Sequence, residues 1–97
     1  MKTVQFITEA RAELLAETEH YTQIQPVLGD QFVAAVERAL AIALAFSTSG
    51  SPAMGGSRKI VVKKFPFSVF YLTVETGIVV IAVAHHARKP NYWKSQV

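Results

Sequence analysis

Cysteine is missing from the sequence, and several kinds of site are excluded with it. A chain without cysteine forms no disulfide, no iron–sulfur cluster, no cysteine-ligated zinc site and no thiol nucleophile. Long apolar runs are also missing. None approaches the roughly 18 residues of a transmembrane helix, and the first residues lack the apolar stretch of a secretory signal. We therefore expect a cytoplasmic protein with no membrane association.

The chain is short but rich in apolar residues. It has 97 residues, of which 51% are apolar and 18% are charged. This composition is typical of a folded domain rather than of a disordered segment. Two domains would leave each half too small for a hydrophobic core of its own. We expect a single domain over residues 1–97.

Acidic residues are scarce in the second part of the chain. Residues 58–97 hold seven Lys or Arg and one acid, Glu75, which is a net charge of +6. Residues 1–57 hold three Lys or Arg and six acids, which is a net charge of −3. Such a division favours an anionic partner on the basic side, although many small domains are mildly basic without one.

The first quarter of the chain predicts a strand followed by a helix. Residues 2–7 alternate polar and apolar side chains, as a half-buried strand does. Thr8 is the expected N-cap, and apolar residues then recur at helical spacing to about residue 23. Pro26 is expected to break this helix, because proline disfavours helical backbone at the residue before it.

A second, more apolar helix is predicted next. Asp30 is its expected N-cap, and the helix runs to about residue 46. It is apolar nearly all round in its second half, so we expect burial on more than one side, with Leu40 in the core. Residues 47–57 are rich in Gly, Ser and Pro and predict a loop.

The last part of the chain predicts three strands. They are expected at 58–64, 67–74 and 78–84, with a hairpin turn at 76–77 between the last two. The third strand shows no alternation and should be buried on both faces, Val80 included. The element order is therefore β-α-α-β-β-β. This is an α+β fold, in which a helical hairpin packs on a mostly antiparallel sheet.

A cluster of basic and aromatic side chains follows the last predicted strand. Arg88 neutralises phosphate, Tyr92 and Trp93 can stack bases, and a histidine at 85 or 86 can move a proton near neutral pH. Such a set suits RNA or another polyanion. The alternative is that both aromatic rings simply cover the end of the sheet, because large aromatics dominate small cores.

Other kinds of site find little support, and we expect no metal and no cofactor. The two neighbouring histidines point to opposite faces of a strand and cannot share one metal ion. Ser68 has no motif of a catalytic triad around it, and Gly55-Gly56 lacks the rest of a phosphate-binding loop. The acidic stripe of the first helix, at positions 9, 13 and 17, is interpreted as a solvated face.

A pattern spread over nearly the whole chain points to a family. Its most specific part is the C-terminal run, and the Phe-Pro-Phe segment comes next. Its residues are Phe6, Glu9, Ala10, Glu13, Leu14, Leu28, Gly29, Phe32, Val36, Glu37, Arg58, Phe65, Pro66, Phe67, Tyr71, Ala84, His85, Arg88, Pro90, Tyr92 and Trp93. With this pattern the chain resembles the RelE/ParE superfamily of type II toxin–antitoxin toxins, closest to the ParE-like branch. The resemblance implies the β-α-α-β-β-β order that was predicted independently.

Two positions depart from the pattern of similar proteins. Ala87 stands where the first of two adjacent arginines is usual, and Gln96 replaces an arginine that often ends the motif. Both changes lower the positive charge at the proposed working end. We therefore expect Arg88 to be the most sensitive functional position.

The resemblance implies a toxin of a plasmid-stabilisation system, neutralised by a cognate acidic antitoxin in a hetero-oligomer. ParE-like members act on DNA gyrase, whereas RelE-like members cut mRNA on the ribosome. The absence of charge in 67–74 favours the gyrase-directed, non-enzymatic interpretation, because RelE-like sites place an arginine there. A ribosome-dependent ribonuclease and a decayed, non-toxic antitoxin-binding member remain the alternatives.

The resemblance also assigns candidate residues. Target-binding candidates are Arg58, Lys63, His85, Arg88, Tyr92 and Trp93. Catalytic candidates, should the protein be a nuclease, are His85, His86, Arg88 and Tyr92. Antitoxin-binding candidates are Leu14, Tyr21, Phe32 and Val36.

Overall fold

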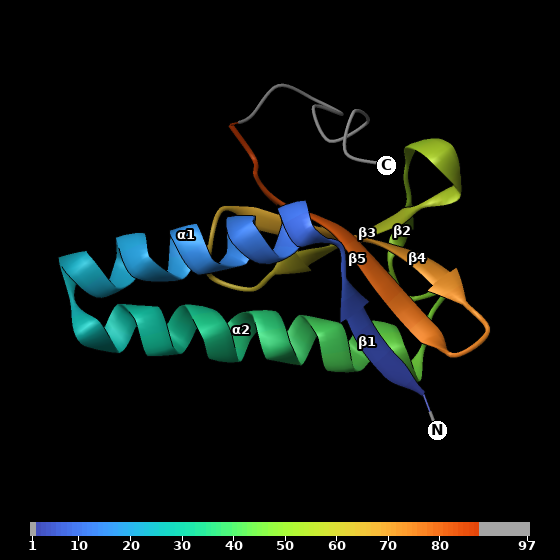
Figure 1. The fold of residues 1–97 in the computed structure, drawn as a ribbon, viewed down its shortest axis with the longest axis horizontal. Helices are drawn as coiled ribbons and strands as arrows, with labels where there is room; N and C mark the ends of the chain where they lie inside the picture. Colours follow the sequence, from blue (N-terminus) through green and yellow to red (C-terminus); the bar gives the residue numbers. More distant parts are fainter. Residues whose placement is uncertain (1, 88–97) are drawn as a thin grey trace.

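The computed structural model describes residues 2–87, and these form two helices and one sheet (Figure 1). The elements are β1 (Thr3–Phe6), α1 (Thr8–Ile24), α2 (Pro26–Ala45), β2 (Ser51–Pro52), a 3-10 turn (Met54–Gly56), β3 (Arg58–Val62), β4 (Phe67–Val74) and β5 (Gly77–His85). The predicted order is confirmed, with one short strand added. Arg88, Tyr92 and Trp93 lie outside the described residues.

The sheet has the strand order β1-β5-β4-β3-β2. β1 runs parallel to β5, and every other pair is antiparallel. The α+β class and the mostly antiparallel sheet are therefore confirmed. β5 lies between β1 and β4, and its residues are buried on both faces of the sheet, as the lack of alternation predicted.

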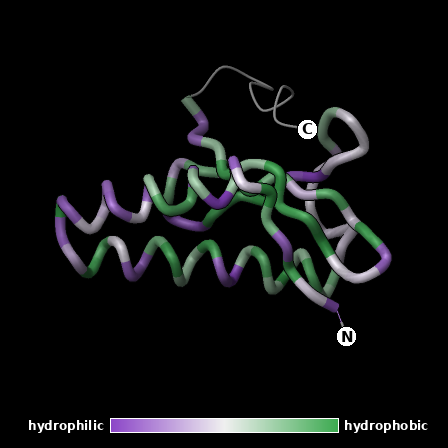
Figure 2. Tube along the Cα trace, viewed as in Figure 1, coloured by the Kyte–Doolittle hydropathy of each residue, from purple (hydrophilic) through white to green (hydrophobic). Residues whose placement is uncertain are grey.

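The core lies between the helix pair and one face of the sheet. Phe32 and Val36 of α2 pack there against Val69 of β4 and Val80 of β5. The predicted burial of Leu40 and Val80 is confirmed, since their exposed fractions are 8% and 0%. Figure 2 shows how strongly apolar residues gather in β5 and in the second half of α2.

Both predicted helix caps are wrong. α1 begins at Thr8 itself, so the N-cap is Ile7, which makes no side-chain cap hydrogen bond. α2 begins at Pro26, four residues before Asp30. Proline suits the first position of a helix because its ring fixes φ and its missing N–H has no partner there. Pro26 therefore ends one helix and begins the next.

The loop predicted over residues 47–57 contains β2, which the sequence analysis missed. β2 pairs with the start of β3 and is only two residues long, too short for a periodic pattern. Gly55 and Gly56 have φ values of 72° and 76°, which suit glycine in the connection to β3. No helix within residues 2–87 has the length and apolar character to cross a membrane.

A fully buried tyrosine fastens this loop to the sheet. The hydroxyl of Tyr71 donates to the carbonyl of Ser47 at 2.9 Å and accepts from the N–H of Gly50 at 3.2 Å. The Arg58 guanidinium also donates to the Gly50 carbonyl, at 2.8 Å. The loop is therefore held from two strands.

Replacing Tyr71 with phenylalanine should lower the free energy of unfolding by about 1–3 kcal/mol. The substitution keeps the buried ring but leaves the Ser47 carbonyl and the Gly50 N–H without their partner. Urea unfolding measures the effect. Equal midpoints for Tyr71→Phe and the wild type would show that the hydroxyl does not hold the loop.

Candidate functional site

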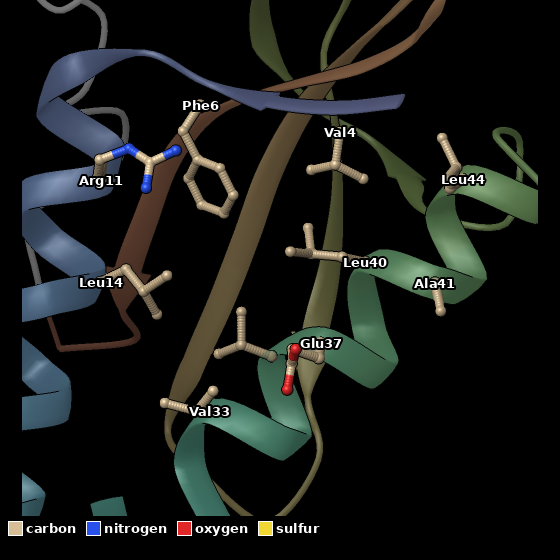
Figure 3. Close-up of a pocket in the computed structure, with 10 residues that line it drawn as sticks. Val4, Phe6, Arg11, Leu14, Val33, Glu37, Leu40, Ala41 and Leu44 are labelled. Carbon is tan, nitrogen blue, oxygen red and sulfur yellow. The ribbon is translucent and has the colours of Figure 1, made fainter. Parts of the chain in front are cut away.

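An open apolar groove of about 500 Å³ lies where β1, α1 and α2 meet (Figure 3). Alternation along β1 turns Val4 and Phe6 toward the helix layer, where they form one side of the groove. The helices supply the other sides. The lining residues are Val4, Phe6, Arg11, Leu14, Val33, Val36, Glu37, Leu40, Ala41 and Leu44.

Two charged side chains accompany this apolar lining. The guanidinium carbon of Arg11 lies 5.4 Å from the centroid of the Phe6 ring, a cation–π distance, and Glu37 comes from α2. The lining contains no nucleophilic side chain and no histidine. The groove lining is thus largely apolar, with one cation and one carboxylate.

The four antitoxin-binding candidates differ in burial and in whether they line the groove. Leu14 lines the groove and is partly buried. Phe32 and Val36 are only 0% and 1% exposed, so Phe32 is a core residue and Val36 provides no more than the floor. The expectation that these two side chains bind a partner directly does not fit their burial. Both lie on the stripe of α2 that packs on the sheet.

Tyr21 belongs to an aromatic cluster rather than to the groove. Its ring centroid is 5.1 Å from those of Phe32 and Phe65, and Phe32 lies 5.2 Å from Phe67. Burial raises the pKa of the Tyr21 phenol, and the Glu17 carboxylate raises it further. The phenol therefore stays neutral, and this partly exposed ring ties α1 to α2 and to the start of β4.

A basic end forms where β3 turns into β4. Phe67 pairs with both Val62 and His85, so the exposed Lys63 and Lys64 of the turn lie near the end of β5. We call Lys63, Lys64, His85 and His86 the basic end. The sequence continues from there with Arg88 and Lys89.

Arg58 does not belong to the basic end. It begins β3, pairs with Tyr71, and lies four residues from Val62, roughly 13 Å along the strand. Its guanidinium is bound to the carbonyls of Thr48 and Gly50. The structure therefore does not bring Arg58 together with Lys63 and His85, and the guanidinium holds the loop.

The two histidines have different partners. The Ala87 N–H donates to Nδ1 of His85 at 2.9 Å, so in this geometry Nδ1 carries no proton, and the ring meets that of Phe67 edge-on. Nε2 of His86 shares a hydrogen bond with Oγ of Ser68 at 2.9 Å. Their rings thus face opposite sides of the sheet. Among residues 2–87 there is no group of three His, Cys, Asp or Glu that would hold a metal ion.

The Ser68–His86 pair does not make a nucleophile. Ser68 is 4% exposed, which keeps its hydroxyl from a substrate. Within the described part of the chain no carboxylate hydrogen-bonds to His86, so the third group of a triad is missing. The pair instead fastens the end of β5 to β4.

Glu13 has a role that the sequence analysis missed. Its carboxylate accepts the N–H of Val83 at 3.0 Å, across 70 residues of sequence. β1 pairs with β5 only as far as Val80, and Glu13 binds the backbone of β5 beyond that point. The sequence could not reveal this hydrogen bond, because the acids at positions 9, 13 and 17 have the spacing of an ordinary solvent-exposed helix face.

Comparison with known proteins agrees with this architecture. The family described as the ParE toxin of the type II toxin–antitoxin system parDE matches residues 4–90. This match over most of the chain shows a toxin of the RelE/ParE superfamily. Within that superfamily, this chain belongs to the ParE toxin family.

A solved structure shows the same fold. It is titled "Chromosomal ParDE TA system from P. aeruginosa", with a TM-score of 0.73 and 20% sequence identity over 88% of this chain and 96% of that chain. None of the curated proteins compared matches the sequence. At this identity the structural likeness establishes the fold alone.

Proposed function

We propose that this ParE-family toxin is neutralised by a cognate acidic antitoxin that fills the groove between β1, α1 and α2. The observation that carries the proposal is the open apolar lining itself. Water-exposed apolar surface of this kind is typical of an interface that a partner covers. The Arg11 guanidinium beside Phe6 supplies a cation for an acidic partner.

We further propose DNA gyrase as the target. A nuclease needs a base for the ribose 2′-hydroxyl, an acid for the leaving oxygen and a cation for the phosphorane. β4 carries no charged residue, and His86 is bound to a buried serine. These observations support a toxin that binds its target without cutting RNA.

Supercoiling by purified gyrase tests the target. We expect the protein to inhibit supercoiling and to leave mRNA intact on translating ribosomes. Ribosome-dependent mRNA cleavage without an effect on gyrase would contradict the proposal and establish the RelE-like alternative. The inactive control is protein incubated beforehand with the antitoxin.

Lys64 has a backbone conformation that is unusual for a lysine. The turn from Val62 to Phe65 is closed by the Phe65 N–H donating to the Val62 carbonyl at 3.2 Å. Within it Lys64 adopts a φ of 72°, where glycine or asparagine is usual. A lysine costs about 1 kcal/mol there. Strained residues gather at functional sites, so we propose Lys64 as a target-binding residue beside Lys63.

Replacing Lys64 with asparagine should lower toxicity without lowering the free energy of unfolding. Asparagine tolerates this backbone, so the free energy of unfolding should stay equal or rise by up to about 1 kcal/mol. Target affinity should fall about fivefold, the effect of one exposed charge pair. Growth arrest and thermal unfolding are measured together, with Lys64→Arg as the charge-retaining control. Full toxicity of Lys64→Asn would remove Lys64 from the target surface.

A further inference from the structure

The end of the helix pair where α1 passes into α2 projects beyond the sheet (Figure 1). α1 ends there at Ile24, and α2 begins at Pro26. The turn between β3 and β4 meets the helix pair just before this end, because the ring centroid of Phe65 lies 5.1 Å from that of Tyr21. The projecting end therefore has a side, continuous with the turn, that the described strands do not cover.

The side chains on this uncovered side are apolar and partly open to water. Ile24 follows Tyr21 by three residues and therefore lies on the same side of α1. Leu28 precedes Phe32 by four residues and lies on the same side of α2. Ile24 is 60% exposed, and the other members of the set are half-buried. We call Tyr21, Ile24, Leu28 and Phe65 the apolar shelf.

Packing between aromatic rings holds the shelf in place before any partner binds. The ring centroids of Tyr21, Phe32 and Phe65 lie 5.1, 5.1 and 5.2 Å apart in their three pairs. Phe32 is fully buried, so it anchors the two partly exposed rings to the core. Because these rings are already ordered, they lose little conformational freedom when a partner covers them. The shelf therefore has the properties of a preformed docking surface.

The charges at the two borders of the shelf have opposite signs. The exposed Lys63 and Lys64 directly precede Phe65. On α1 the carboxylate of Glu17 lies within electrostatic reach of the Tyr21 phenol. A nucleic acid laid across the shelf would bring phosphates toward this carboxylate and would offer little apolar surface to the shelf. A protein segment avoids both costs, because it can place a carboxylate at the lysines and apolar side chains on the shelf.

We propose that the apolar shelf and the two neighbouring lysines form one docking surface for a segment of the protein target. The segment carries a carboxylate that binds Lys63 and Lys64, and apolar side chains that pack on the shelf around Ile24. This inference rests on the gyrase-directed function proposed above and names the part of the toxin that recognises the target. No shelf residue lines the groove, so changes to the shelf should leave antitoxin binding unchanged.

Titration of purified gyrase with the full-length toxin, in the absence of DNA, tests the shelf. The variant is Ile24→Ser, which removes apolar surface without changing the charge. The matched control is Leu15→Ser, because Leu15 is 62% exposed on the same helix but lies two and a half turns from Ile24, on the opposite side. Affinity for gyrase should fall about tenfold for Ile24→Ser and stay unchanged for Leu15→Ser. Thermal unfolding and antitoxin affinity should be the same for both variants.

The salt dependence of gyrase affinity separates the charged part of the surface from the apolar part. The loss of affinity caused by Lys64→Asn should shrink as salt rises from about 0.05 to 0.5 M, because exposed charges are screened. The loss caused by Ile24→Ser should persist over the same range, because apolar contacts carry no charge to screen.

The possible failures of this experiment have different meanings. Wild-type affinity of Ile24→Ser for gyrase, or an equal loss in Leu15→Ser, would overturn the shelf and leave gyrase as the target. A loss of antitoxin affinity in Ile24→Ser would assign the shelf to the antitoxin and overturn the proposal. A complex with gyrase that forms only on DNA would overturn it in favour of a nucleic-acid surface. Failure of the wild type to bind gyrase under any of these conditions would overturn both the shelf and the proposed target.

Discussion

Replacing Gly77 with alanine should lower the free energy of unfolding by about 3 kcal/mol or more. Gly77 begins β5 with a φ of 142°, a conformation that residues with a side chain rarely adopt. A Cβ atom there would stand 2.7 Å from the N atom of Thr3 and closer still to its carbonyl oxygen. This clash could be relieved only if β1 moved away from β5. The backbone strain and the lost pairing of the two strands would then both lower the free energy of unfolding.

Gly55 provides the matched control for this prediction. Its φ is also positive, at 72°, but an added Cβ would meet nothing within 4 Å. Gly55→Ala should therefore cost only about 1 kcal/mol, the backbone part of the penalty. Urea unfolding compares the two variants. Similar losses for Gly55→Ala and Gly77→Ala would contradict the close approach of β1 and β5. Because β1 forms one side of the groove, Gly77→Ala should also weaken antitoxin binding.

A lysine in place of Ala41 should weaken antitoxin binding by about 30-fold or more. Ala41 is exposed and lines the groove, so Ala41→Lys puts a cation where the partner's apolar side chains must pack. Glu37 lies one turn away on the same helix, but burying the lysine under the partner still costs at least about 2 kcal/mol, because its long side chain takes the place of packed apolar groups. The free toxin should be unaffected, because a surface substitution on a helix changes stability by only about 0.5 kcal/mol.

Ala34 separates this effect from a general effect of charge. It lies on the same helix and is also exposed, but it does not line the groove. Ala34→Lys should bind antitoxin as the wild type does, and isothermal titration measures all three affinities. Equal weakening by Ala34→Lys and Ala41→Lys would mean that the groove is not the binding site.

The fold could be predicted from the sequence because most elements have strong local patterns. Residues 67–74, aromatic and β-branched, form β4 with the predicted bounds, and the prediction at 78–84 differs from β5 by one residue at each end. The helix boundary failed because Pro26 has two roles, ending one helix and beginning another. Local patterns also gave no partner for β1, whose pairing with β5 joins residues more than 70 positions apart.

The candidate site was less predictable, for a related reason. Periodicity shows that one face of α2 is apolar, but not which part of that face the sheet covers. Phe32 lies under the sheet, whereas Ala41 is exposed in the groove. The same limit applies to Arg58. The resemblance names it as a target-binding candidate, and only the structure shows that its guanidinium is bound to the loop, away from the basic end. Only the three-dimensional arrangement separates these roles.

The growth rate of bacteria after induced expression of this chain shows whether it is a toxin that is neutralised through the groove. We expect the wild type and Ala41→Lys both to arrest growth when expressed alone. Co-expression of the small acidic protein encoded next to the chain should restore growth for the wild type and not for Ala41→Lys. Growth without arrest in cells that contain folded wild-type protein, or equal rescue of both variants, would contradict a toxin neutralised through this groove.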